Sequence, residues 1–343
     1  MVLDTLLIYL LGKIADKALD EALKQGFHLA KNAVEGKFPS KISLTGGLFL
    51  PKSQLVNMEK ELRAIKQALA ERSQGRLLYV RGEGGVGKTR LLEESAKITQ
   101  SATGILWGGL IDLYHSNFHS APHLQKTIAN NLDPKDLYFK KYRQFQAEFE
   151  RKRSSGISTA NELDELEDVF LADYNLLASA KRIALAFDTL EKIDDEYDLV
   201  QQIEASAAAG YTIQRWLLRF CANAQNTTII MAGRPAPALQ KRFESDFSQP
   251  GRFEIIQLDG LGRVDTRQLL KIYAKQGDKT AVHLDAYADA LWDYTKGAPA
   301  HLAMTVELSK HVADAVRANP EGKINSEQFS REMIETFFNY QDP

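Results

Sequence analysis

The sequence predicts an α/β protein in which helices flank a parallel sheet and an all-helical domain follows the sheet. From residue 41 to Leu258, apolar runs alternate with helical stretches, which is typical of parallel βαβ units. After Leu258 only helical patterns remain. We therefore expect a short helical N-terminal segment over residues 1–40, a sheet domain over 41–258 and a helical lid domain over 259–343.

Each expected strand is a short apolar run, and each expected helix repeats apolar residues at helical spacing. The strands are Leu77–Val80, Gly104–Leu110, Ile183–Phe187, Thr228–Ala232 and Phe253–Leu258. The helices of the sheet domain are Gln54–Glu71, Thr89–Thr99, Glu162–Leu177 and Tyr211–Ala224. The lid helices are Asp265–Gln276, Leu284–Thr295, His301–Ala318 and Ser326–Asn339. Residues 133–165 are rich in charge, so we expect a solvated insertion there.

The N-terminal segment has a broad apolar helical face, in which apolar residues recur from Leu7 to Leu23. One interpretation is a helix packed on the rest of the chain. The other is an effector or self-association module, or a helix that contacts a membrane surface. No stretch is long and apolar enough to span a membrane, and the segment lacks the basic start of a signal peptide.

Composition indicates an ordinary soluble protein of about two domains. The net charge of −2 gives no strong sign of a nucleic-acid binder. The single cysteine, Cys221, excludes an internal disulfide and suits the cytoplasm. It lies in an apolar helical stretch, which favours a buried structural thiol over a nucleophile.

A glycine-rich loop, Gly82–Thr89, follows the first expected strand and precedes a helix. It fits the phosphate-binding pattern G-x-x-x-x-G-K-[ST], in which backbone N–H groups and the helix N-terminus face the phosphates. Lys88 is expected to reach the β- and γ-phosphates, and Thr89 to ligate Mg²⁺. The loop residues expected to bind the nucleotide are Gly82, Gly84, Gly85, Val86, Gly87, Lys88, Thr89 and Arg90.

Two later strand ends carry charged residues that suit the same site. Asp188 ends a buried run, where a carboxylate can hold Mg²⁺ beside the phosphate loop. Glu191 is placed to orient or deprotonate the attacking water. Arg234 follows the next strand and is suited to sensing a γ-phosphate. The alternative is a pair of helix-capping carboxylates and a surface arginine.

The order of these motifs resembles the signal-transduction ATPases with numerous domains (STAND), and the likeness covers roughly residues 44–312. It rests on the phosphate loop, Asp188-Thr-Leu-Glu191, Gly233-Arg-Pro235 and Lys296-Gly-Ala-Pro299. The second acidic residue, three positions after the first, is similar to the NACHT branch. The resemblance implies a P-loop NTPase fold, Mg²⁺ with ATP or ADP, a sensor role for Arg234 and a nucleotide contact by Pro299.

The resemblance also implies that Leu50 and Pro51 border the adenine. Lys52 stands where these ATPases usually carry arginine, and the resemblance carries over only the contacts of the backbone and of Leu50. Relatives normally continue into a winged helix and sensor repeats, whereas this sequence ends at Pro343. It is therefore either cut at a domain boundary or a short relative.

A histidine cluster, His115, His119 and His123, has a spacing that could ligate a metal from one helix. Pro122 interrupts that spacing, so we do not expect a metal there. Asp112 could help to arrange Mg²⁺-bound water. No guanine-recognition pattern follows its own strand, which favours adenine.

Three hypotheses follow. The first is a slowly hydrolysing ATP switch that self-associates on activation by an unknown trigger. The second is an AAA+ or origin-recognition-like ATPase that acts on nucleic acid or protein. The third is a scaffold that holds ADP without hydrolysis.

Overall fold

The computed structural model describes residues 56–71, 75–115, 118, 120–155, 162–193, 213–247, 249, 251–275 and 288–303. The expected N-terminal segment over 1–40, Leu50, Pro51, the helix over 326–339 and most of the helix over 301–318 lie outside the described residues. The chain forms two compact units. One runs from Asn57 to Gly260, and Val56 and the residues from Leu261 onward belong to the other.

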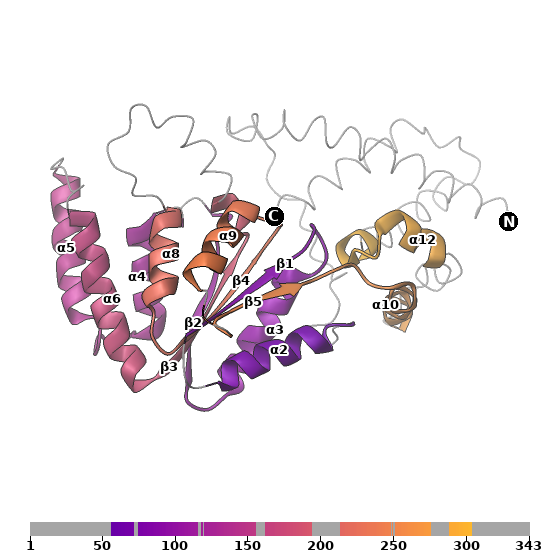
Figure 1. Ribbon diagram of the computed structural model, residues 1–343, viewed down its shortest axis with the longest axis horizontal. Helices are drawn as coiled ribbons and strands as arrows, with labels where there is room; N and C mark the ends of the chain where they lie inside the picture. The colour runs from indigo at the N-terminus through magenta and orange to yellow at the C-terminus, as the bar shows by residue number, and fades with distance from the viewer. Residues whose placement is uncertain are drawn as a thin grey trace, which may run out of the picture. The chain divides into compact units, whose positions relative to one another are not determined.

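The unit from Asn57 to Gly260 is built on a parallel sheet with the strand order β2-β3-β4-β1-β5 (Figure 1). The strands are β1 (Arg76–Arg81), β2 (Ile105–Asp112), β3 (Arg182–Asp188), β4 (Thr227–Gly233) and β5 (Phe253–Gln257). Each expected strand is present, and the predicted α/β fold class is confirmed. Both neighbours of β1 come from much later in the chain, so the sheet forms only when distant segments pair.

Helices cover both faces of this sheet (Figure 1). Helix α3 (Lys88–Ser101) packs on β2, β3 and β4, and α2 (Glu59–Ala70) packs on α3. A second group of helices, α4 (Ala121–Leu132), α6 (Glu162–Ala180), α8 (Ile213–Asn223) and α9 (Pro237–Asp246), shares one apolar core with alternate strand residues. Because both faces are covered, the strands read as continuous apolar runs rather than as alternating ones.

The α2 prediction was wrong at its start, because Asn57 adopts the left-handed φ of 56° and the helix begins only at Glu59. The region over residues 133–165, which we expected to be a solvated insertion, contains a helix with one buried face. Helix α5 (Lys140–Ser154) packs against α6 and buries Tyr142, Gln146 and Phe149 at helical spacing. Its many charges concealed this apolar stripe in the sequence.

Six aromatic rings fill the core beneath α5, α6 and α8. Phe170 lies at their centre, 5.2 Å from the ring of Tyr142 and 5.7 Å from that of Phe139. Trp216 stacks on Phe220 at 5.2 Å. Cys221 is buried beside these rings in α8, and burial raises the pKa of its thiol. The expected buried thiol is confirmed.

The second unit contains α10 (Arg263–Lys275) and α12 (Ala288–Thr295), which pack on each other. The chain turns at Gly297, where φ is 72° and an added Cβ would lie 2.0 Å from the carbonyl oxygen of Leu261. Only glycine fits there. Leu261 N–H donates to the carbonyl of Gly297 at 2.8 Å, which ties this turn to the start of the unit. Among the described residues, no helix is long and apolar enough to cross a membrane.

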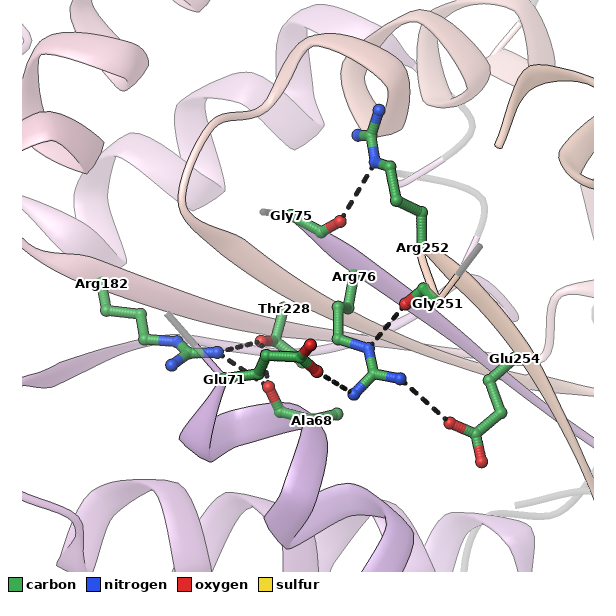
Figure 2. Close-up of polar contacts among 9 residues, drawn as sticks. All are labelled: Ala68, Glu71, Gly75, Arg76, Arg182, Thr228, Gly251, Arg252 and Glu254. Atoms are coloured by element: carbon green, nitrogen blue, oxygen red, sulfur yellow. Dashed lines mark hydrogen bonds and ion pairs between the residues drawn. The ribbon is translucent and has the colours of Figure 1, made fainter. Parts of the chain in front are cut away.

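Arginines fasten the N-terminal ends of the strands to their surroundings (Figure 2). Arg76 of β1 donates to the carbonyl of Gly251 at 2.8 Å and pairs with Glu71 and Glu254. Arg182 of β3 donates to the carbonyl of Ala68 at 2.7 Å. These guanidinium groups satisfy main-chain carbonyls and join β1, β5 and the end of α2.

We expect Arg76→Ala to lower the free energy of unfolding by about 0.5–1.5 kcal/mol, because the hydrogen bond to the Gly251 carbonyl is lost. Two partly exposed ion pairs add little to this value. Urea denaturation measures the change, and Lys126→Ala, which breaks only the exposed pair with Glu150, is the matched control. An equal loss in both variants would contradict the anchoring role of Arg76.

Candidate functional site

The C-terminal ends of four neighbouring strands bring the predicted residues to one edge of the sheet. Asp112 of β2 lies opposite Asp188 of β3 in the strand register. Arg81 of β1 lies opposite Gly233 of β4, so the glycine loop and the Gly-Arg-Pro turn leave the sheet side by side. This is the edge at which parallel α/β sheets bind ligands, where the strand order reverses.

The glycine loop joins β1 to α3 and ends at Gly87, whose φ of 101° favours glycine. Lys88 folds back over the loop, and its Nζ donates to the carbonyls of Gly82 and Glu83, both at 2.8 Å. Burial lowers the pKa of Lys88, and although Glu191 and Asp188 oppose this effect, the pKa stays below its ordinary value. Lys88 is thus held beside the loop as a partly desolvated cation.

The Thr89 hydroxyl donates a hydrogen bond to Asp188, with 2.5 Å between Thr89 Oγ1 and Asp188 Oδ2. Asp188 is buried at the end of β3. Burial raises the pKa of Asp188, and hydrogen bonds from the Thr89 hydroxyl and the Thr189 N–H offset this only in part. A hydroxyl and a desolvated carboxylate at this distance are the hard oxygen donors that suit Mg²⁺.

Thr189 carries backbone strain, because its φ of 59° lies in the left-handed region that β-branched residues avoid. Its hydroxyl donates to Asp112 Oδ1 at 2.7 Å, and its N–H donates to Asp188 Oδ1 at 2.9 Å. Asp112 therefore holds the turn that carries Asp188 and Glu191. Strain of this kind gathers at functional sites. From the sequence, we expected only a minor role for Asp112, in arranging Mg²⁺-bound water, and none for Thr189.

Glu191 and Arg234 contact each other across the ends of β3 and β4. The Arg234 N–H donates to Glu191 Oε2 at 2.9 Å, and Arg234 Nε lies 3.7 Å from Oε1. A Cβ added at Gly84 would lie 3.3 Å from Arg234 Nη2, so the guanidinium lies over the glycine loop. The structure thus brings Lys88, Glu191 and Arg234 together.

Other predicted site residues lie elsewhere or are engaged within their own helix. Arg90 pairs with Glu93 and Glu94 at 2.7 and 2.9 Å. Pro299 belongs to the second unit, so its expected nucleotide contact stays a prediction. Leu50 and Pro51 lie outside the described residues.

His115 and His123 do not lie along one helix, because α4 begins at Ala121 and has Pro122 in its first turn. His115 and His123 instead contact the ring of Phe118, with centroids 6.4 and 5.5 Å apart. His119 lies outside the described residues. Where residues are described, no group of three or more His, Cys, Asp or Glu side chains could hold a metal ion.

Residues 54–208 match the family model of the AAA ATPase domain. For this part of the chain, the match confirms the resemblance to AAA+-like P-loop ATPases. A search of curated proteins gave no match.

Solved structures similar to this chain include two ORC proteins and a STAND protein. The Aeropyrum pernix ORC2 protein, in complexes with ADPNP and ADP, shares 12% identity at a TM-score of 0.46, over 84% of this chain and 69% of that chain. The ORC1 protein of the same organism, in complex with DNA, shares 14% identity at a TM-score of 0.47, over 83% and 67%. A STAND protein with a tetratricopeptide repeat sensor from Pyrococcus horikoshii shares 13% identity at a TM-score of 0.42, over 86% of this chain and 34% of that chain.

Two buried aspartates with opposite pKa shifts give a test of the site's electrostatics. The pKa of Asp188 is raised, so its ionised form destabilises the folded state, and Asp188→Asn should unfold at equal or higher urea concentration at pH 7 in EDTA.

Asp133 is the matched control. Burial raises its pKa, but N–H donors from Leu137, Tyr138 and Phe139 and the charge of Arg143 outweigh burial and leave the pKa lowered. Its ionised form stabilises the fold, so Asp133→Asn should lower the free energy of unfolding by about 1–3 kcal/mol. As the pH falls, the Asp188→Asn difference should disappear by about pH 4, the ordinary carboxyl pKa, because the raised pKa of folded Asp188 lies above that value. The Asp133→Asn difference should instead be lost as the pH falls from about 4 through the lowered pKa of folded Asp133. A clear loss of stability in Asp188→Asn at pH 7 would contradict this account.

Proposed function

We propose that this chain is an ATP-binding, slowly hydrolysing molecular switch of the STAND type, which couples its nucleotide state to domain rearrangement and oligomerisation in signalling. The observation that carries the proposal is the position of Arg234. The Arg234 guanidinium lies over Gly84 of the glycine loop, and the main-chain N–H of Arg234 donates to Glu191 Oε2. A cation at this position suits the recognition of a γ-phosphate, by which ATP differs from ADP.

The residues at the edge of the sheet fit a Mg²⁺–nucleotide complex. The loop and the N-terminus of α3 would present backbone N–H groups to the phosphates, and Lys88, which lies against the loop, would add a positive charge. Thr89 and Asp188 would hold Mg²⁺, directly or through water. When bound, Mg²⁺ neutralises charge on the β- and γ-phosphate oxygens.

Hydrolysis needs a water molecule in line with the γ-phosphate and a group that accepts its proton. Glu191 is the nearby carboxylate suited to that role, and Lys88 and Arg234 would stabilise the charge that develops on the phosphate. Glu191 is at the same time an acceptor for the Arg234 N–H. A base that is also tied to the sensor turn suits a slow, regulatory turnover.

The switching itself would come from contacts that only the triphosphate makes. A ligand shifts a conformational equilibrium only by its difference in affinity for the two states. Arg234 in the sheet unit and the turn at Pro299 in the second unit are the proposed sources of that difference. The proposal also includes a cytoplasmic location, an effector role for residues 1–40 and activation by an unknown trigger.

We expect Glu191→Gln to lower the steady-state ATPase rate by about 10²–10⁴-fold with little change in ATP affinity, because glutamine accepts no proton but still accepts the Arg234 N–H. Phosphate release and titration calorimetry measure the two quantities. Glu150→Gln, a partly exposed carboxylate on α5, is the control. An unchanged, background-level rate in Glu191→Gln would instead support an ADP-holding scaffold.

We expect ATP with Mg²⁺ to increase the molar mass of the full-length protein in solution, and ADP to leave it small. Light scattering after size-exclusion chromatography measures this. Lys88→Ala should stay at the ADP mass with either nucleotide, because the cation that binds the phosphates is lost. If both proteins keep one mass whatever the nucleotide, with the whole chain present, the switching model fails.

A further inference from the structure

We infer that Tyr79 is a positioning residue that sets the discrimination between ATP and ADP by holding the main chain of Arg234 in place. The inference rests on the proposed function of Arg234 and extends it to a buried strand residue that makes no contact with the nucleotide in our proposal. Tyr79 lies in β1, two residues before the strand ends at Arg81 and leads into the glycine loop.

The hydroxyl of Tyr79 is bonded to both sides of the Arg234-Pro235 step. It donates to the carbonyl of Arg234 at 2.7 Å, and it accepts the N–H of Ala236 at 3.2 Å. The Tyr79 side chain is fully buried; its hydrogen bond to Ala236 is buried and its hydrogen bond to Arg234 is partly buried. A main-chain N–H and a carbonyl buried without a partner are costly, and the hydroxyl satisfies both.

The main-chain N–H of Arg234 also has a hydrogen-bond partner. The Arg234 N–H donates to Glu191 Oε2 at 2.9 Å. Pro235 further restricts Arg234, because a residue before proline is confined to extended conformations. Gly233 allows this close approach, since an added Cβ would lie 2.8 Å from Glu191 Oε2. The backbone of Arg234 is thus fixed at its N–H, its carbonyl and the following ring.

The side chain of Arg234, in contrast, is 62% exposed. An exposed arginine samples many rotamers, so the site gains precision only from a fixed starting point for that side chain. Tyr79 supplies this point from the strand that also starts the glycine loop. The loop that holds the phosphates and the turn that carries the sensing cation therefore share one rigid strand.

The test compares two buried tyrosines that each lose one hydroxyl. Tyr79→Phe removes the bonds to Arg234 and Ala236. Tyr174→Phe is the matched control, because Tyr174 is equally buried and its hydroxyl bonds Thr227 Oγ1 at 2.9 Å, at the opposite end of β4. Both variants are titrated with ADP and with a non-hydrolysable ATP analogue in Mg²⁺, using the full-length protein.

We expect Arg234→Ala to reduce the preference for the ATP analogue over ADP by roughly 10- to 100-fold, the range of a hydrogen bond to a charged group. Tyr79→Phe should reduce the same ratio by roughly 3- to 10-fold, which corresponds to one ordinary hydrogen bond. Tyr174→Phe should leave the ratio at the wild-type value. Amide hydrogen exchange at residues 234–236 should become faster in Tyr79→Phe only, which gives a second readout if that variant is unstable.

The outcomes separate the inference from its premise. If Arg234→Ala lowers the ratio but Tyr79→Phe behaves like Tyr174→Phe in both measurements, the positioning role of Tyr79 is wrong and the sensor role of Arg234 stands. If Arg234→Ala leaves the ratio unchanged, the proposed sensing by Arg234 fails, and the inference about Tyr79 fails with it.

Discussion

The pairing of β1 with β4 is the constraint on which the site depends. These strands lie far apart in the sequence, yet their parallel register places Arg81 opposite Gly233. The Gly82 N–H then donates to the Gly233 carbonyl at 3.3 Å, which continues the pairing by one residue beyond the sheet. A shift of the register by one residue would turn Tyr79 to the other face of the sheet. The glycine loop and the Gly-Arg-Pro turn would then lose their common support.

The N-terminal ends of the strands carry contacts that stabilise the fold, whereas the C-terminal ends carry the candidate site. At the N-terminal ends, the guanidinium groups of Arg76 and Arg182 satisfy main-chain carbonyls and tie the helix and strand ends together (Figure 2). At the C-terminal ends, Asp188 is a desolvated carboxylate and Thr189 has an unfavourable φ. Natural proteins tolerate strained or poorly solvated groups where the surrounding structure is over-determined. The hydrogen-bonded N-terminal ends of the strands therefore help to stabilise a sheet whose C-terminal ends carry a strained and a desolvated residue.

The sequence was informative about the strands and about the types of residue at their ends. Buried parallel strands are continuous apolar runs, and the phosphate loop and its acidic partner have recognisable patterns. Helices α4 and α9 were missed because each has proline in its first turn, and proline at that position starts a helix as readily as it ends one. Helix α5 was missed because its charges outnumber its three buried residues.

The contacts between site residues were beyond a local pattern. Tyr79 belongs to an apolar run, and nothing near it in the sequence indicates that its hydroxyl meets Arg234, because that meeting is set by the strand register. The left-handed φ of Thr189 is likewise fixed by Asp112 from a neighbouring strand. A tyrosine in the apolar strand that leads into a phosphate loop is the sequence signal that could have indicated a positioning role for Tyr79.

The buried thiol of Cys221 has a practical consequence for following this protein in solution. It is the chain's single cysteine, it is enclosed in α8, and burial raises its pKa, so little thiolate forms at neutral pH. Maleimide dyes react with thiolates that solvent can reach. Cysteines introduced at exposed positions, one in each unit, can therefore be labelled while the native residue stays in place. Energy transfer between such dyes would then report nucleotide-dependent changes without any redesign of the core.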